Sequence, residues 1–419
     1  MTSWLECGDC GRSAREAAVQ VNCVYCSGEL RVRYKSARLE QERNAPGIFR
    51  YSSRLPVSDL SKVVSLGEGQ TPLVDVVGDT RQRLGLPRAR VKCESSNPTG
   101  SFKDRIAAVA ATIMNERDIP GCIGTSSGNG GAAMAAYAAR SGRPLIIFGL
   151  SDTLPQKVLQ ITAAGAHLTL LAGLGHDPRA TEAALEEIVM GAVEFGYMPF
   201  VTATRFMPEA MEGAKTIAYE LAEQAPEATA IYVPIGGGGL FAALWRGYSE
   251  IADLLPNGPP RLIAVQPSGC RTVSRLQAGL DAVIDGPVET TISGLQVAFL
   301  FEPLGVKTAL QSSNGHLVEV DDQAVWAAQA LLLREEGLFV EPAGATAFAG
   351  VLADAHSGLL SADDNVVALA TGAGFKDPAA LARVAGPDTV STVSLEDIRS
   401  VMETALAATS GRRRPAPRR

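Results

Sequence analysis

Short, continuous apolar runs alternate with longer amphipathic stretches along most of the chain. Each run has the length of a strand buried on both faces of a sheet, and the stretches between them have helical periodicity. This alternation predicts an α/β protein with mainly parallel sheets, in which ligands bind at the carboxyl ends of the strands. The predicted strands are 121–125, 144–150, 167–172, 199–203, 230–235, 261–266, 317–320 and 366–370, and the predicted helices include 180–195, 209–223, 240–254 and 321–336.

A turn-forming segment, residues 97–105 (Asn-Pro-Thr-Gly-Ser-Phe-Lys-Asp-Arg), precedes the small, apolar, helix-compatible run 106–114. Because Asn-Pro and Thr-Gly disfavour helix up to Gly100, we expect Lys103 in the first turn of that helix. The helix dipole and removal from water both disfavour an ammonium there, so the pKa of Lys103 should fall, and a neutral amine can form an imine with a carbonyl. On this segment alone, an ordinary lysine that reaches back to water is an equal alternative.

Four consecutive glycines, residues 236–239, follow the apolar run 231–235 and precede a helix that opens at Leu240. The backbone N–H groups of such a turn can converge without obstruction by side chains, and the helix adds its positive end, so the turn suits a phosphate dianion. The loop lacks the pattern of a nucleotide triphosphate site and fits the dinucleotide pattern only loosely. It therefore favours a small phosphate ester.

Two further turns also follow apolar runs. Residues 125–131 (Thr-Ser-Ser-Gly-Asn-Gly-Gly) offer donors to an anion such as a substrate carboxylate, and Asn129 can donate to a phenolate oxygen; helix capping is the alternative. In residues 371–378 (Thr-Gly-Ala-Gly-Phe-Lys-Asp-Pro), the Thr371 hydroxyl can meet a ring nitrogen or bond to nearby backbone. One ligand accounts for the imine-forming lysine, the phosphate turn, the amide and the hydroxyl, and that ligand is pyridoxal 5′-phosphate.

The composition permits an enzyme of ordinary size. The 419 residues, 46% hydrophobic and 20% charged, predict two or three domains with sizeable cores. The net charge of −7 argues against a general nucleic-acid binder, and the basic cluster 412–419 predicts a solvated tail. The chain shows neither a signal-peptide pattern nor an apolar stretch of about 18 residues, so we expect a soluble, cytoplasmic protein without a membrane partner.

Four of the seven cysteines form two Cys-x-x-Cys pairs separated by twelve residues. This spacing is typical of a zinc ribbon, in which each pair presents two thiolates and two pairs complete a closed tetrahedral site. Two disulfides or free thiols are the alternative. Four thiolates leave no open position for water, so the expected zinc is structural and not catalytic. The predicted ligands are Cys7, Cys10, Cys23 and Cys26.

These motifs, together with Glu-Pro-Ala-Gly-Ala at 341–345, resemble fold-type II pyridoxal phosphate enzymes of the tryptophan synthase beta superfamily in order and spacing. Residues 66–73 (Leu-Gly-Glu-Gly-Gln-Thr-Pro-Leu) and the terminal Lys-Asp-Pro turn look specifically like the threonine synthase family. The resemblance covers roughly residues 60–380. It implies an α/β fold with two parallel-sheet domains, pyridoxal phosphate as cofactor, a small-molecule amino-acid substrate and a homodimer.

The resemblance also implies roles for individual residues. Lys103 would bind the cofactor covalently and then take the α-proton of the substrate, while Asn129 would contact the cofactor's 3′-oxygen and Thr371 its pyridine nitrogen. A hydroxyl opposite this nitrogen stabilises a pyridinium less than a carboxylate does, which favours elimination and replacement over transamination. The cofactor phosphate would lie on Gly236, Gly237, Gly238 and Gly239, and the substrate carboxylate on Ser126, Ser127, Gly128 and Gly130.

Several positions depart from the family pattern. Gly130 stands where threonine synthases carry a threonine, and Ala210 stands where an arginine that holds the substrate phosphate is expected. Arg205 is the candidate to supply this missing charge in the substrate site. The four-glycine loop, in addition, is more similar to threonine and serine ammonia-lyases.

Three functions follow from these observations. The leading one is a pyridoxal-phosphate-dependent lyase or synthase of threonine synthase type, which expels phosphate or another leaving group from an amino acid, for example O-phosphohomoserine, and adds water or another nucleophile. The second is a threonine or serine ammonia-lyase that gives a 2-oxo acid and ammonia. The third is a non-catalytic interaction protein built on the ribbon and the tail.

The same reasoning divides the chain into domains. We expect a zinc-ribbon-like module at 1–35 and a small substrate-carboxylate domain at 106–204. A large cofactor-binding domain would combine 36–105 with 205–400, and a disordered basic tail would occupy 401–419.

Overall fold

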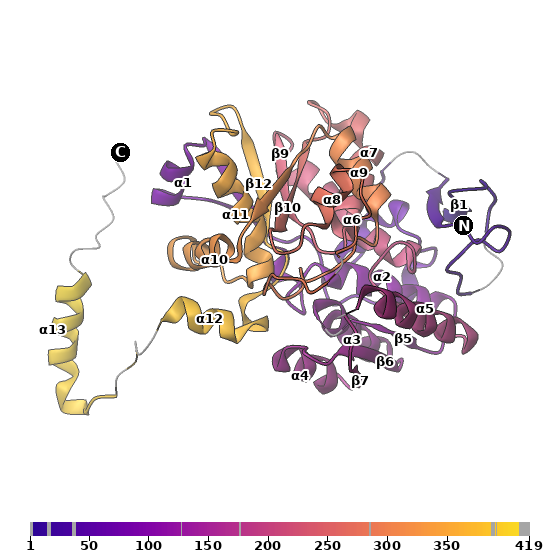
Figure 1. The fold of residues 1–419 in the computed structure, drawn as a ribbon, viewed down its shortest axis with the longest axis horizontal. Coiled ribbons are helices and arrows are strands. Elements are labelled where there is room, and N and C mark those ends of the chain that lie inside the picture. The colour runs from indigo at the N-terminus through magenta and orange to yellow at the C-terminus, as the bar shows by residue number, and fades with distance from the viewer. Residues whose placement is uncertain are drawn as a thin grey trace.

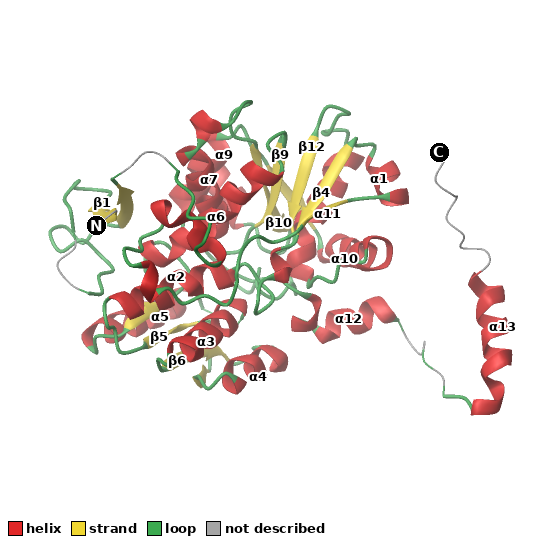
Figure 2. Ribbon diagram, turned by 180° about the vertical axis from the view of Figure 1, so that it is seen from behind, coloured by secondary structure: helices red, strands yellow, loops and turns green. Residues whose placement is uncertain are grey.

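The structure is a computed structural model that describes residues 3–14, 18–35, 39–126, 128–175, 177–284, 286–386, 390 and 392–409. Its described part contains two parallel-type sheets and a small two-stranded sheet at the N-terminus, with helices packed around the larger sheets (Figure 1 and Figure 2). The α/β architecture expected from the sequence is therefore confirmed.

The larger sheet has six strands, and only its edge strand β3 runs antiparallel to its neighbour. In spatial order the strands are β11 (Leu317–Val320), β10 (Arg261–Pro267), β9 (Ala230–Pro234), β12 (Asn365–Leu369), β4 (Arg88–Lys92) and β3 (Leu73–Asp75).

The smaller sheet is wholly parallel, and its strands lie within the proposed small domain. Their order is β7 (His167–Leu171), β6 (Leu145–Leu150), β5 (Cys122–Thr125) and β8 (Met198–Phe200). All eight strands predicted from apolar runs are confirmed, although the one predicted at 199–203 ends at Phe200. Strand β4 was not predicted, because basic residues interrupt its apolar positions. They fit into the sheet because they have acidic partners: Arg90 pairs with Glu227 and Lys92 with Glu220.

Alternate residues of the central strands divide between two cores, as the pleat of a strand requires. Ile231 and Val367 face one core, which includes helices α6 (Pro208–Gln224), α7 (Gly239–Glu250) and α9 (Pro303–Ser312). Tyr232 and Ala368 face the other core, which includes α10 (Asp322–Glu336) and α11 (Pro342–His356). Both faces of the sheet are thus covered, which is why its strands read as continuous apolar runs.

The remaining helices complete the layers around the two sheets. The predicted helix 240–254 ends at Glu250 as an α-helix and continues as the 3-10 turn Ala252–Leu254, while the other three predicted amphipathic helices are confirmed within a few residues. The further helices are α1 (Gly78–Leu84), α2 (Lys103–Glu116), α3 (Asn129–Ser141), α4 (Pro155–Ala163), α5 (Pro178–Glu194), α8 (Thr272–Gln277), α12 (Pro378–Ala385) and α13 (Ile398–Thr409).

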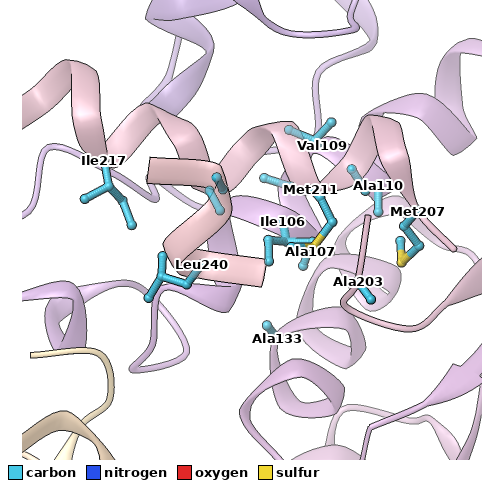
Figure 3. Close-up of a cluster of buried hydrophobic side chains, with 14 of the residues drawn as sticks. Ile106, Ala107, Val109, Ala110, Ala133, Ala203, Met207, Met211, Ile217 and Leu240 are labelled. Atoms are coloured by element: carbon cyan, nitrogen blue, oxygen red, sulfur yellow. The ribbon is translucent and has the colours of Figure 1, made fainter. Parts of the chain in front are cut away.

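Helix α2 is buried on nearly all sides between α6 and α3 (Figure 3). Its residues Ile106 and Val109 belong to the same core as Met211 of α6 and Ala133 of α3. A Cβ at Gly213 of α6 would overlap the backbone carbonyl of Arg105, so the glycine allows the two helix backbones to touch. The start of α2 is therefore held by close packing.

A fully buried ionic network fixes the same helix start. The Arg105 guanidinium makes paired hydrogen bonds of 2.7–2.9 Å to Glu94 and to Glu220, and it also donates to Thr216, 2.9 Å away. All five of its N–H donors are thereby used. Lys92 of β4 contacts the same Glu220 carboxylate at 2.7 Å. These cations hold the pKa of Glu220 below its usual range despite the opposing effect of burial.

The N-terminal segment forms a separate antiparallel pair, β1 (Ser3–Cys7) with β2 (Leu30–Tyr34), that packs on α6. The hydroxyl of Tyr34 donates to Glu212 at 2.9 Å, and the Lys215 ammonium lies 4.1 Å from the centre of the Tyr34 ring. The N-terminal module is thus tied to a central helix of the protein.

The C-terminal segment differs from the expected disordered tail. Residues 401–409 are part of helix α13, which stands away from the body of the molecule in Figure 1 and Figure 2, because apolar residues recur with helical spacing from Ile398 to Leu406. Residues 410–419 lie outside the described residues. Among the described helices, none combines the length and the apolar character needed to cross a membrane.

The network around Arg105 makes a prediction about stability. Arg105→Met would leave two buried carboxylates with one fewer counter-charge, so we expect the free energy of unfolding to fall by about 3–5 kcal/mol. Arg88→Met is the matched control, because Arg88 is 60% exposed and its pair with Glu227 should contribute less than about 1 kcal/mol. Urea unfolding of both variants provides the measurement, and equal losses would contradict the assignment.

Candidate active site

The turns singled out in the sequence follow strands that are neighbours in the sheets. Strands β9, β12 and β4 lie side by side and parallel, so the glycine loop, the Thr371 turn and the segment leading to Lys103 begin at one edge of the large sheet. In the small sheet, β5 and β8 are parallel neighbours, which brings the turn after Thr125 next to the segment that contains Thr202. The carboxyl ends of parallel strands are where α/β proteins bind ligands.

Lys103 is the first residue of α2 and lies beside the Thr371 turn. The backbone N–H of Phe102 donates to the Thr371 carbonyl at 3.1 Å, and the Lys103 Nζ donates to the Thr202 hydroxyl at 2.7 Å. Burial lowers the pKa of Lys103 to about 8, against the opposing field of Glu302. A neutral amine is therefore accessible near neutral pH, as the sequence predicts.

Glu302 is a residue that sequence reasoning did not identify. Its Oε1 accepts from the Thr204 backbone N–H at 3.0 Å and from the Thr204 hydroxyl at 2.5 Å, and its Oε2 lies 3.4 Å from Arg246. A lone glutamate before Pro303 gives no signal in the sequence, because only the fold brings it to the segment that contacts Lys103.

The glycine loop 236–239 closes tightly around the start of α7. Gly238 has φ of +89°, a conformation that side chains disfavour, and a Cβ on Gly239 would lie 2.8 Å from Met211 Cε and 3.1 Å from Glu302 Oε1. Within the described part of the chain, none of the four N–H groups of this loop donates a hydrogen bond. Free N–H groups at a helix N-terminus form an anion site.

Asn129 and Glu341 meet opposite the Thr371 turn. The Asn129 Nδ2 donates to Glu341 Oε1 at 2.5 Å, and a Cβ on Gly372 would overlap that same carboxylate oxygen. The Asn129 Oδ1 is buried and has no hydrogen-bond partner among the described residues. A buried acceptor of this kind calls for a donor from outside the described residues.

The turn after β5 is as crowded as the glycine loop. The Ser126 hydroxyl accepts from the Gly131 N–H at 2.9 Å, and a Cβ on Gly130 would lie 2.6 Å from the Ser126 Oγ and 3.3 Å from the Thr202 methyl group. A threonine at position 130 would therefore require Ser126 to move. Ser127, also predicted to bind the substrate carboxylate, lies outside the described residues.

Arg205 has partners other than those the sequence analysis proposed for it. Its guanidinium pairs with Glu182 at 3.2 Å and with Glu186 at 2.8 Å, both on α5, and its side chain is 38% exposed. Ala210 is buried at the start of α6. No described contact brings Arg205 to Lys103, so its role in substrate binding stays a prediction.

The four clustered cysteines come together in the N-terminal module. Their sulfur atoms all lie within 4.8 Å of one another, and no disulfide joins them. Backbone N–H groups of Asp9 and Tyr25 point at the Sγ atoms of Cys7 and Cys23 at 3.4 Å. The other three cysteines are buried elsewhere.

Comparisons with known proteins agree with this geometry. Residues 64–372 match the family described as "Pyridoxal-phosphate dependent enzyme". The chain is 32% identical to a threonine synthase of Methanocaldococcus jannaschii over 90% of this chain and 94% of the relative. It is 33% identical to a threonine synthase of Halalkalibacterium halodurans over 78% of this chain and 88% of the relative.

A similar fold occurs in solved structures. The processed form of threonine deaminase isoform 2 from Solanum lycopersicum superposes with a TM-score of 0.62 at 22% identity, covering 84% of this chain and 97% of that one. Maize serine racemase superposes with a TM-score of 0.60 at 23% identity over 80% of this chain and 94% of that one. At these identities the likeness concerns the fold.

The surroundings of Lys103 predict how its reactivity depends on pH. Only the neutral amine attacks an aldehyde, so the rate of covalent attachment of pyridoxal phosphate to the cofactor-free chain should rise with pH and level off above about 8. The Glu302 charge raises the pKa of Lys103, so Glu302→Gln should move the midpoint of this profile to lower pH. The absorbance change on mixing measures the rate. The exposed Glu187 supplies the control variant Glu187→Gln, and a profile that Glu302→Gln leaves unmoved would contradict the assignment.

Proposed function

The chain belongs to the family of pyridoxal-phosphate dependent enzymes and is a lyase of that family, and from this premise we propose that it works as a threonine synthase-type enzyme. It would expel phosphate or another leaving group from an amino acid and add water or another nucleophile. The observation that carries the proposal is the Lys103 amine: its pKa is lowered to about 8, and its helix start lies beside the Thr371 turn at the sheet edge where the glycine loop also begins. The non-catalytic interpretation no longer stands.

The residues present fit pyridoxal phosphate. The N–H groups of loop 236–239, which have no partner among the described residues, suit its phosphate, and the Asn129 amide keeps a second N–H for the oxygen on its ring. Thr371 would meet the ring nitrogen with a neutral hydroxyl. When bound, the cofactor supplies an electron-accepting ring that makes bonds at the substrate α-carbon easier to break.

Within this site, the residues of the chain would divide the work as follows. Lys103 binds the cofactor covalently and, once released, accepts the α-proton of the substrate at its Nζ, because its lowered pKa makes the neutral form available. The Thr202 hydroxyl, 2.7 Å away, orients that amine. Ser126, Ser127, Gly128 and Gly130 would bind the substrate carboxylate with hydroxyl and N–H donors.

A second function, that of a threonine or serine ammonia-lyase, is favoured by specific observations. Arg205 is paired with Glu182 and Glu186, and Ala210 is buried, so neither supplies a free cation for a substrate phosphate. A substrate without phosphate, such as serine or threonine, needs no such cation. The product of this alternative is a 2-oxo acid with ammonia.

We further propose that the four clustered cysteines bind one structural zinc ion. With Zn–S bonds of about 2.3 Å, a tetrahedral site has sulfur–sulfur separations of about 3.8 Å. The Cys7–Cys26 and Cys10–Cys23 separations of 3.5 Å and 3.7 Å support this assignment, as does the closed set of four sulfur donors.

A substrate screen tests the reaction. Purified protein with bound pyridoxal phosphate is given O-phosphohomoserine, O-phosphoserine, threonine and serine, and both released phosphate and 2-oxo acid are assayed. The leading function predicts phosphate release without 2-oxo acid, and the second predicts 2-oxo acid from the unphosphorylated substrates. Lys103→Ala should abolish both turnover and covalent attachment, while the exposed Lys62→Ala should retain them. Full activity in Lys103→Ala would overturn the mechanism.

A metal assay tests the zinc proposal. Cys7→Ser removes one sulfur ligand, so we expect zinc content to fall from about one ion per chain and the urea midpoint of unfolding to drop, because bound metal stabilises only the folded module. The buried Cys93→Ala, which also removes one thiol, is the control and should keep its zinc. Zinc-free wild-type protein with intact thiols would refute the proposal.

A further inference from the structure

Lys157 is an unusual lysine because its side chain is only 2% exposed. It lies in the first turn of α4, a helix that packs on the small sheet. A buried ammonium needs a counter-charge and hydrogen-bond acceptors, since removal from water disfavours it. It has both: its Nζ donates to the Ser293 hydroxyl at 3.1 Å and lies 3.6 Å from Glu341 Oε2.

Glu341 connects this lysine to Asn129 of the candidate cofactor site. While its Oε2 faces Lys157, its Oε1 accepts the 2.5 Å hydrogen bond from the Asn129 amide. Lys157 of α4, Glu341 just before α11 and Asn129 at the start of α3 therefore form a continuous row. The row ends at the buried Asn129 Oδ1, which has no partner among the described residues.

The other charged groups near Glu341 come from the turn that precedes α12 and from α2. Lys376 is also buried and donates to Gln160 at 3.0 Å; burial lowers its pKa to about 8 against the opposing charges of Glu341 and Asp104. Asp104 is hydrogen-bonded to Thr99 at 2.8 Å. Lys157 is thus the cation paired directly with Glu341, whereas Lys376 interacts with the Glu341 charge from farther away.

We propose that Lys157 is a positioning residue for the reaction. By pairing with Glu341 it holds that carboxylate in place, and the carboxylate in turn orients the Asn129 amide toward the ring of the cofactor. The inference rests on the proposed function, because it assigns the position beside Asn129 to the ring of pyridoxal phosphate. It deepens that function by adding a residue that touches neither substrate nor cofactor.

The charge balance has a measurable consequence. Without the ammonium, the Glu341 carboxylate beside the ring would lack its nearest counter-charge, and an uncompensated negative charge favours the protonated form of the bound cofactor. The uncompensated Glu341 carboxylate would also repel the anionic oxygen on the ring of the cofactor. A purely mechanical tie between α4 and the rest of the protein would produce neither electrostatic effect.

The experiment compares variants of the full chain loaded with pyridoxal phosphate. Lys157→Gln keeps a hydrogen bond to Ser293 but loses the charge, and we expect the pH midpoint of the cofactor's visible absorbance to rise by about one unit and its dissociation constant to increase about tenfold. Lys157→Arg retains the charge and should stay near wild type. Lys157→Gln combined with Glu341→Gln removes both charges, so its midpoint should return toward wild type. Lys307→Met, at an exposed position, is the control.

The outcomes separate an electrostatic role of Lys157 from a purely mechanical one. An unmoved midpoint and dissociation constant in Lys157→Gln, or the same shift in the double variant as in the single one, would overturn the inference while leaving the proposed function intact. A wild-type chain that binds no pyridoxal phosphate would overturn the proposed function and the inference together. If Lys157→Gln does not fold, Lys157→Arg and the double variant still decide, because the inference requires both to have midpoints close to wild type.

Discussion

The paired hydrogen bonds of Arg105 to two buried glutamates are the constraint on which the site depends. Glu94 follows β4, Glu220 belongs to α6, and Arg105 itself lies two residues after Lys103, so one guanidinium fixes the start of α2 relative to the sheet. A network of this kind costs desolvation energy, and apolar residues can often match its stability. We interpret the network as selecting one position of the α2 start, and with it one position of Lys103.

The same network explains the segment that most resembles threonine synthases. In residues 66–73, Thr71 donates to Glu94 at 2.7 Å and the backbone N–H of Gln70 donates to Glu220 at 2.7 Å. Glu68 of this segment accepts from Tyr137 on α3, also at 2.7 Å. A family signature therefore ties the Arg105 network to helix α3, which is a structural reason for its residue types.

How far the sequence predicts this molecule depends on whether a feature is local. Apolar runs and glycine turns are local, so the eight strands and the helix start at Lys103 follow from the sequence. Strand β4 does not, because its buried Arg90 and Lys92 have ion-pair partners more than a hundred residues away along the chain. Glu302 and Lys157 were missed for a related reason. A single glutamate or lysine carries no pattern, and its chemistry arises only when the fold supplies Thr204 or Glu341 as a neighbour.

A line of polar contacts leads from the N-terminal module to the segment around Lys103. Tyr34 donates to Glu212, Arg246 bridges Glu212 and Glu302 at 3.2 Å and 3.4 Å, and Glu302 holds Thr204, two residues beyond the threonine that contacts the amine. A lineage that shed the cysteine-rich module would lose a partner of a buried carboxylate and would need compensating changes along α6 and α7. Transplanting the module or the catalytic body alone would leave this line of contacts incomplete.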